Sequence, residues 1–241
     1  MELIAYPLLL MAFVVIFCAE VIAPASDNQC NRRWLILAGA LNLTQMVVSL
    51  AVGYVFREKI ARQALLPLPE AFPAPLVGLL AFLVTSFIFY WWHRALHANN
   101  FLWRTVHQLH HSPQRLESLS AFYAHPIDSA VATAIGCLSS YVVFGASAAA
   151  AAWCVLFTGL FNLYVHSDTR SPRWVGLWVQ RPEMHRVHHQ RGLHAHNYGI
   201  PLWDLLFRTW SNPHERVALC GFETDKEARV FDMLRGRDVK G

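Results

Sequence analysis

The chain has 241 residues, of which 55% are hydrophobic and only 15% are charged, and its formal net charge is +4. Soluble domains carry about 25% charged residues, so this composition excludes an ordinary soluble domain and favours an integral membrane protein. The small positive charge is typical of a membrane protein whose basic residues lie on one side of the bilayer and contact anionic lipid, and it predicts no nucleic-acid partner.

Three apolar segments in the first half of the chain predict transmembrane helices. The first runs from Leu3 to Ala23, the second from Trp34 to Phe56 and the third from Pro75 to Trp92. Each is about as long as a bilayer is thick. Glu20, inside the first segment, is costly in lipid, so it predicts either a polar partner or a place at the membrane interface.

The stretch 129–165 has no charged residue. A single helix of that length would exceed the thickness of a bilayer, so we predict two helices that turn near Gly145. Small residues at 146–152 suit close helix packing in lipid. The pair either crosses the membrane, which gives five spans, or forms a re-entrant hairpin.

Most of the 20 Lys and Arg residues lie in the polar regions 93–128 and 166–241. Cytoplasmic loops carry an excess of these residues, so we expect both regions in the cytoplasm. Arg57, Lys59 and Arg62 then face outward or lie in the headgroup plane. The predicted fold is an all-α membrane bundle of four or five transmembrane helices with a cytoplasmic, histidine-rich helical cap.

Histidines gather in short boxes next to these segments. The boxes are His93-Arg-Ala-Leu-His97, His107-Gln-Leu-His110-His111 and His185-Arg-Val-His188-His189, the last two sharing the pattern H-x-x-H-H. Residues three and four apart lie on one helix face, so each box should point two or three imidazoles at a common spot. Imidazole is a common ligand of transition metals, and the boxes therefore predict a metal centre near one membrane surface.

Nine histidines are the candidate ligands, and His125 is a tenth. Nine or ten imidazoles suit two metal ions with four or five nitrogens each and room for a small exogenous ligand. Ligation by nitrogen alone is compatible with iron, and also with zinc, copper or nickel. The nine are His93, His97, His107, His110, His111, His166, His185, His188 and His189.

Zinc hydrolysis is disfavoured by the motifs. The sequence has no H-E-x-x-H, and no box contains an internal glutamate to act as the general base. A glycine-rich phosphate loop and a serine nucleophile elbow are also missing from the sequence. Redox chemistry at two irons beside a membrane fits the boxes better.

Further motifs accompany the boxes. They are Tyr-Ala-His125-Pro-Ile-Asp128, His166-Ser, Arg181-Pro before the last box, and Asn197-Tyr198-Gly199 followed by Leu202-Trp203-Asp204-Leu-Leu-Phe207. The combined series, over about residues 75–212, resembles the fatty acid hydroxylase superfamily, which includes sterol desaturases, sterol C4-methyl oxidases, fatty acid 2-hydroxylases and alkylglycerol monooxygenases.

The resemblance implies a membrane-bound, non-haem di-iron oxygenase, an oxidoreductase of EC 1.14 type. Such an enzyme uses two iron ions and O2 to hydroxylate, or to desaturate, an aliphatic C–H bond of a lipid substrate. It also implies a separate electron donor, either cytochrome b5-like or ferredoxin-like with its reductase. On this basis the chain divides into a transmembrane hairpin and loop (1–73), a fatty acid hydroxylase-like catalytic domain (74–212) and a polar tail (213–241).

Metal-bound histidines usually donate their second nitrogen to a carboxylate or a carbonyl. Candidates for this outer layer are Asn162, Asp128, Asp204 and Asn197, with Asp168 and Glu183 as further acids near the boxes. Asp128 replaces the glutamate of many members, and Asn162 stands where some members have another histidine, so it would hold a water on one metal or cap a turn. His194 and His196 are interpreted as surface or outer-layer residues.

A second hypothesis belongs to another class: a histidine-rich membrane protein that binds or transports metal without oxygenase activity. Transport requires polar residues along a path through the membrane. The predicted spans are nearly free of ionisable residues, and the histidines gather at one surface. The oxygenase is therefore the favoured hypothesis.

Overall fold

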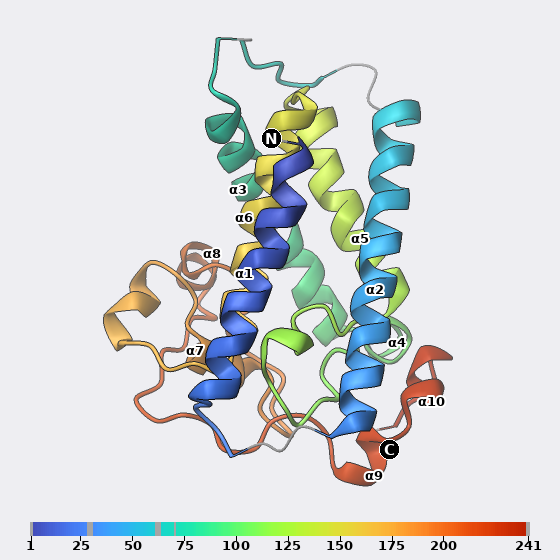
Figure 1. Ribbon diagram of the computed structural model, residues 1–241, viewed down its shortest axis with the longest axis vertical. Coiled ribbons are helices and arrows are strands. Elements are labelled where there is room, and N and C mark those ends of the chain that lie inside the picture. Colours follow the sequence, from blue (N-terminus) through green and yellow to red (C-terminus); the bar gives the residue numbers. More distant parts are fainter. Residues whose placement is uncertain (1, 28–30, 61–63, 70, 240–241) are drawn as a thin grey trace.

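The computed structural model describes all residues except 1, 28–30, 61–63, 70 and 240–241. Within this described part the chain is helical, and its β-structure is limited to an isolated antiparallel bridge between Gln190 and Cys220. Five helical segments there are long and apolar enough to cross a membrane. They are α1 (Glu2–Ile22), α2 (Arg32–Val55), α3 (Ala74–Ala98), α5 (Pro126–Cys137) continued by the π-helical η4 (Leu138–Val143), and α6 (Ala148–His166). The predicted all-helical membrane bundle is confirmed (Figure 1).

The outer surfaces of these helices are apolar. Leu10, Val15, Leu50 and Tyr54 are each at least half exposed, and no polar stripe accompanies them as it would on a surface helix of a soluble protein. Large contiguous apolar surfaces mark contact with a membrane or a partner. The chain is accordingly an integral membrane protein.

The uncharged stretch forms the hairpin expected from its length. Gly145 adopts a left-handed backbone (φ +60°) between η4 and α6, a conformation that glycine adopts at no steric cost. Gly78 of α3 lies directly against the start of α6: a β-carbon added there would lie 2.4 Å from the Cβ of Trp153 and 2.7 Å from the carbonyl oxygen of Ala150. Close packing along the alanine run, as predicted, joins α6 to α3.

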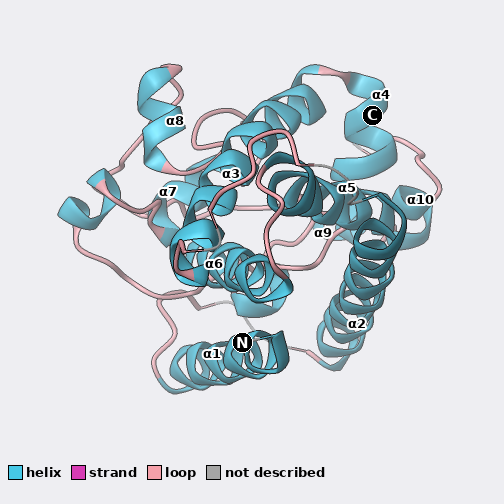
Figure 2. Ribbon diagram, turned by 90° about the horizontal axis from the view of Figure 1, so that it is seen from above, coloured by secondary structure: helices cyan, strands magenta, loops and turns pink. Residues whose placement is uncertain are grey.

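Short helices cover one end of the bundle as a cap, and one of them lies beside the long helices. In chain order they are α4 (Asn100–Leu102), η2 (Trp103–His107), η3 (Ser118–Ser120), η5 (Arg173–Leu177), α7 (Pro182–His188), α8 (Pro201–Leu206), α9 (Thr224–Glu227) and α10 (Val230–Leu234). Figure 1 shows α9 and α10 at the foot of the bundle, whereas α8 lies beside the long helices. Seen from above, α8 and α2 lie on opposite sides of α3 and α6 (Figure 2).

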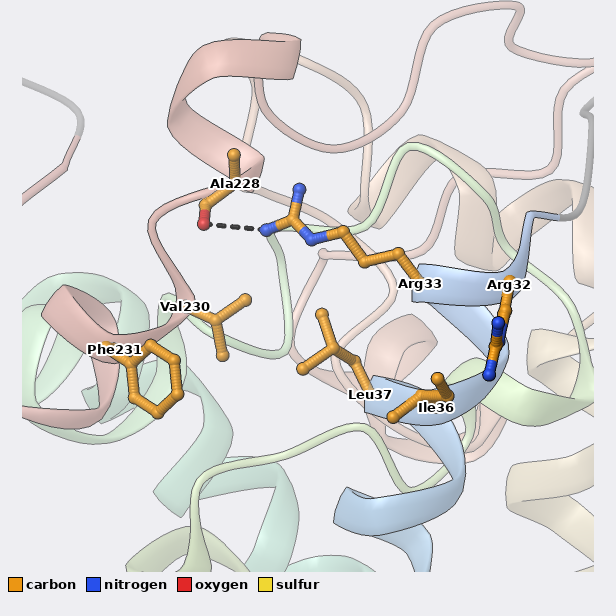
Figure 3. A pocket seen from close by; sticks show the side chains of 7 residues that line it. All are labelled: Arg32, Arg33, Ile36, Leu37, Ala228, Val230 and Phe231. Atoms are coloured by element: carbon orange, nitrogen blue, oxygen red, sulfur yellow. Dashed lines mark hydrogen bonds between the residues drawn. The ribbon is translucent and has the colours of Figure 1, made fainter.

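The C-terminal segment is part of this cap. Val230, Met233 and Val239 are buried in one core with Trp34 of α2 and Trp103 of η2. At its edge lies a hollow of about 420 Å³, where Arg33 donates a hydrogen bond to the carbonyl of Ala228 (2.8 Å; Figure 3). Residues 213–239 thus supply apolar packing to the cap as well as polar surface.

Glu20 has the polar partners that its position near the end of α1 predicts. Its carboxylate is 2% exposed and accepts hydrogen bonds from the backbone N–H of Ser118 (2.9 Å), from the Ser118 hydroxyl (2.5 Å) and from the N–H of Asp168 (2.7 Å). This carboxylate connects α1 to the loops that follow the second histidine box and α6.

Replacing Glu20 with alanine should destabilise the protein. The substitution leaves buried donors of Ser118 and Asp168 unpaired, and each unsatisfied donor costs about 1–3 kcal/mol. We expect a lower midpoint of thermal unfolding in detergent for E20A and an unchanged midpoint for D27N, since Asp27 is exposed. Equal midpoints for E20A and wild type would contradict this role of Glu20.

Candidate metal centre

Nine buried or partly buried histidines meet at the capped end of the bundle in two groups. Within each group the nearest ring nitrogens all lie within 4.8 Å of one another. Seven of the nine side chains are at most 5% exposed, and His97 and His110 are partly buried. Group one is His93, His97, His107, His111 and His188; group two is His110, His166, His185 and His189.

Each H-x-x-H-H box is divided between the groups: two of its imidazoles lie in one group, and the third lies in the other. His107 and His111 belong to group one, whereas His110 belongs to group two. In the last box His185 and His189 belong to group two, whereas His188 belongs to group one. The reason is geometric: residues four apart share a helix face, but adjacent residues are about 100° apart around the axis. In each box the two residues four apart, His107 and His111 or His185 and His189, share a group, and the histidine between them lies in the other group.

The local backbone supports this division. The second box begins at the end of the π-helical turn η2 and continues in a turn, not in a regular α-helix; π-helical turns are frequent at functional sites. The last box lies on α7, which begins with Pro182 at its first position. The two groups are neighbours, since the rings of His111 and His189 stack with centroids 4.1 Å apart.

Hydrogen bonds at Nδ1 determine the tautomer of five of these histidines. The Nδ1 atoms of His93 and His188 lie 2.8 Å from the carbonyl oxygens of Tyr198 and His196. Three more pairs are similar: His107 with the carboxylate of Asp128 (2.8 Å), His110 with the carbonyl of Tyr123 (3.2 Å) and His166 with the carbonyl of Asn162 (2.9 Å). Carbonyls and carboxylates only accept, so each Nδ1 carries the proton and each Nε2 presents a lone pair.

These lone pairs face one another. The Nε2 atoms of His93 and His188 are 3.0 Å apart, and those of His110 and His166 are 3.3 Å apart. Because each of these rings carries its proton on Nδ1, neither contact between Nε2 atoms is a hydrogen bond. The facing lone pairs repel each other unless a cation lies between them. The donor set therefore fits bound metal ions.

Unpaired ring nitrogens support the same conclusion. Both ring nitrogens of His97, His111 and His189, and Nε2 of His107, are buried without a hydrogen-bond partner among the described residues. A buried polar group without a partner costs free energy, and metal ligation would satisfy these atoms.

Burial keeps the imidazoles neutral. Desolvation lowers the pKa of His110, His111, His185, His188 and His189 well below the ordinary value, and neighbouring histidines lower it further. A metal ion binds the neutral ring, so the centre is ready for metal at neutral pH.

Of the acids expected in the outer layer, Asp128 contacts a ring nitrogen directly. It is 6% exposed, and its carboxylate also accepts a hydrogen bond from the indole of Trp92 (3.3 Å). Asp168 instead pairs with Arg216 and Ser26, and Glu183 pairs with Arg181 and Ser171. These two acids hold cap loops together.

Asp204 and Asn197 act through the backbone. Asp204 accepts hydrogen bonds from the N–H groups of Tyr198 (2.9 Å) and Gly199 (3.1 Å), and Asn197 bonds through its side chain to the backbone of Met184 and Ser211. Together they hold the loop whose carbonyls bond to His93 and His188. Asn162 contributes its backbone carbonyl to His166.

His125 lies in neither group. Its Nδ1 accepts a hydrogen bond from the N–H of Ile127 (3.1 Å) as the N-cap of α5, and its Nε2 lies 3.2 Å from the carbonyl of Leu234. His194 also lies outside the groups, although its ring centroid is 5.1 Å from that of His111. We leave both out of the proposed ligand set.

The backbone acceptors at His196, Tyr198 and Tyr123 were not predicted from the sequence. His196 and Asn197 both adopt left-handed backbone angles (φ 66° and 51°), which are uncommon outside glycine and tend to occur at functional sites. Asparagine tolerates this conformation better than most residues. Asn197 in the motif Asn-Tyr-Gly was thus the available signal for this turn.

The fold and the site define a class: an all-helical integral membrane protein whose boxes form two adjoining histidine groups able to hold metal. The family model for fatty acid hydroxylase matches residues 78–209, more than half of the chain. The chain belongs to the fatty acid hydroxylase family.

Curated relatives agree with this assignment. The chain is 32% identical over 151 residues to an ornithine lipid hydroxylase of Rhizobium tropici, covering 60% of this chain and 45% of the relative. It is 34% identical over 105 residues to a methylsterol monooxygenase of Arabidopsis thaliana (44% and 38%), and 26% identical over 179 residues to a very-long-chain aldehyde decarbonylase of Oryza sativa (72% and 69%). The match thus spans less than half of the first two relatives. No solved structure is significantly similar to the chain.

The carboxylate of Asp128 should strengthen metal binding through His107. Loss of such an outer partner typically lowers metal affinity 10–100-fold, so we expect a weaker affinity of this order for D128N in a metal titration of the apoprotein. The control is D232N, since Asp232 pairs with the exposed side chains of Arg229 and Arg237. Equal affinities for D128N and D232N would contradict this role.

Acid should destabilise the metal-free protein. In the unfolded chain the side chains of His110, His111, His185, His188 and His189 take up protons near pH 6.5, whereas in the folded protein their pKa is lower. Below pH 6.5 the unfolded state therefore binds more protons than the folded state. Stability should therefore be full above pH 6.5 and decline below it, by about 1.4 kcal/mol for each unit of pKa difference at each group. Unfolding midpoints of chelator-treated protein between pH 8 and pH 5 test this, and a flat profile would contradict it.

Proposed function

We propose that the protein is a membrane-bound, non-haem di-iron oxygenase that uses O2 to hydroxylate an aliphatic C–H bond of a lipid. The observation that supports this proposal most directly is the convergence of nine imidazoles in two adjoining groups. Membership of the fatty acid hydroxylase family and the names of the relatives, a lipid hydroxylase and a sterol monooxygenase, support it independently.

The ligand set favours iron over a hydrolytic zinc. A zinc hydrolase needs a bound water and an adjacent general base, whereas both groups consist of histidines alone, and Trp103 packs against His97 and His111. Two irons bound here would supply the activation of O2. The chain's own residues hold the ions, keep the ring nitrogens deprotonated at Nε2 and exclude bulk water.

The balance of the reaction requires an external reductant. Insertion of one oxygen atom into a C–H bond reduces the other oxygen atom to water, and this consumes two electrons and two protons. We propose that a separate electron-transfer protein, cytochrome b5-like or ferredoxin-like, delivers them. Desaturation has the same demand for electrons and also begins with cleavage of a C–H bond, so it is the other outcome open to this site.

We also propose that the histidine groups lie on the cytoplasmic side. The cap contains most of the basic residues, whereas Arg57 and Lys59 lie in the π-helical turn Phe56–Ile60 at the opposite end of α2. Arg62 lies outside the described residues. An excess of basic residues marks the cytoplasmic face, which is also where soluble electron donors are available.

Metal content and activity should depend on both groups. We expect about two irons per purified wild-type chain, and consumption of O2 with formation of a lipid product heavier by one oxygen when a reductant and a membrane lipid extract are added. H97A, in group one, and H185A, in group two, should each lose at least one iron and nearly all product. The control H214A alters an exposed histidine and should behave as wild type.

Two results would overturn the oxygenase proposal. A protein fully loaded with zinc or copper that consumes no O2 would favour a metal-binding or transport protein instead. Full activity in H97A or H185A would show that the groups do not carry the chemistry.

A further inference from the structure

The helix α8 packs on the middle of a membrane-spanning helix, although it follows the last histidine box in the chain. The indole N–H of Trp203 donates a hydrogen bond to the hydroxyl of Ser86 on α3 (2.9 Å), and its ring lies 5.0 Å from that of Phe87. Phe207, just after α8, contacts Trp91 (4.8 Å between ring centroids). These contacts hold α8 against residues 86–91 of α3.

This part of α3 lies inside the expected hydrocarbon layer. Arg94 is the first charged residue of α3, and Ser86 precedes it by eight residues, or roughly 12 Å at about 1.5 Å per residue. Half of the hydrocarbon core is about 15 Å thick. In Figure 1, α8 indeed lies beside the long helices, well away from α9 and α10 at their foot.

The outward face of α8 is apolar and continuous with the lipid-facing surface of α3. Leu202, Leu205 and Leu206 are 52%, 51% and 62% exposed, and Trp91 beside them is 43% exposed. A cluster of exposed leucines at this level is unfavourable in water. It suits acyl chains, which already surround the neighbouring helix.

The polar groups of this segment are satisfied internally, as lipid requires. Asp204 is fully buried and accepts hydrogen bonds from Tyr198, Gly199 and the hydroxyl of Thr209. The backbone N–H of Thr209 donates a hydrogen bond to the carbonyl of Asp204, and the carbonyl of Thr209 accepts one from the N–H of Asn197. Arg208 is exposed at the end of the segment, where its long side chain can extend its charge to the headgroups.

We propose that residues 198–209 form a re-entrant element that enters the bilayer from the capped end, with α8 embedded in the hydrocarbon of that leaflet. The ligand of this surface is the bilayer itself. The proposal rests on the membrane-spanning bundle and does not depend on oxygenase activity. Because Tyr198 bonds to His93, the embedded element directly supports group one.

Depth measurements by electron paramagnetic resonance test the proposal. Nitroxide labels are placed one at a time at L205C, at L79C and at E215C, in a chain whose five cysteines are serine, reconstituted in phosphatidylcholine nanodiscs. Leu79 is exposed on α3, and Glu215 is exposed on the cap. We expect the ratio of O2 to nickel-chelate accessibility at L205C to match L79C and to exceed E215C several-fold. A ratio equal to that at E215C would overturn the proposal.

A second pair of variants retains the native cysteines. L205D and L219D each place a carboxylate at an exposed leucine, 51% and 61% exposed, but Leu219 lies on a cap loop bonded to Arg191. We expect L205D to lower the unfolding midpoint by several degrees in nanodiscs and L219D to leave it unchanged. Equal tolerance of both substitutions would count against embedding of α8.

Discussion

The whole site depends on the placement of one proton in each of five imidazole rings. A carbonyl or carboxylate acceptor at Nδ1 keeps the proton there and leaves Nε2 as a lone pair. The lone pairs of His93 and His188 then face each other across 3.0 Å, a contact that is favourable only around a cation. Burial reinforces the arrangement, because it disfavours protonation as the alternative way to relieve the repulsion.

Elements far apart in the chain supply these acceptors. Asp128 comes from the start of α5, Asn162 from the last turn of α6, and the carbonyls of His196 and Tyr198 from a loop with two left-handed residues. That loop is held by Asp204, whose side chain is fully buried. The cap and the membrane bundle are therefore a single structure around the histidines, and Glu20 joins α1 to it.

Hydropathy and residue type were sufficient to predict the five spans, the turn at Gly145 and the nine histidines that meet, because each depends on local composition or spacing. The sequence did not predict how the boxes divide, since that depends on the turn after His107 and on the orientation of α7. Main-chain acceptors such as the carbonyl of Tyr198 leave no mark in residue identity. The position of α8 was also unpredictable, because its apolar face resembles that of any short amphipathic helix.

The division of the boxes has a mechanical consequence. His110 and His111 are consecutive residues that serve different groups, and so are His188 and His189. Consecutive α-carbons are 3.8 Å apart across a trans peptide bond, a distance that conformational change leaves unaltered. The backbone therefore links the two groups covalently at two places, so the groups cannot move apart by more than these two pairs of side chains allow.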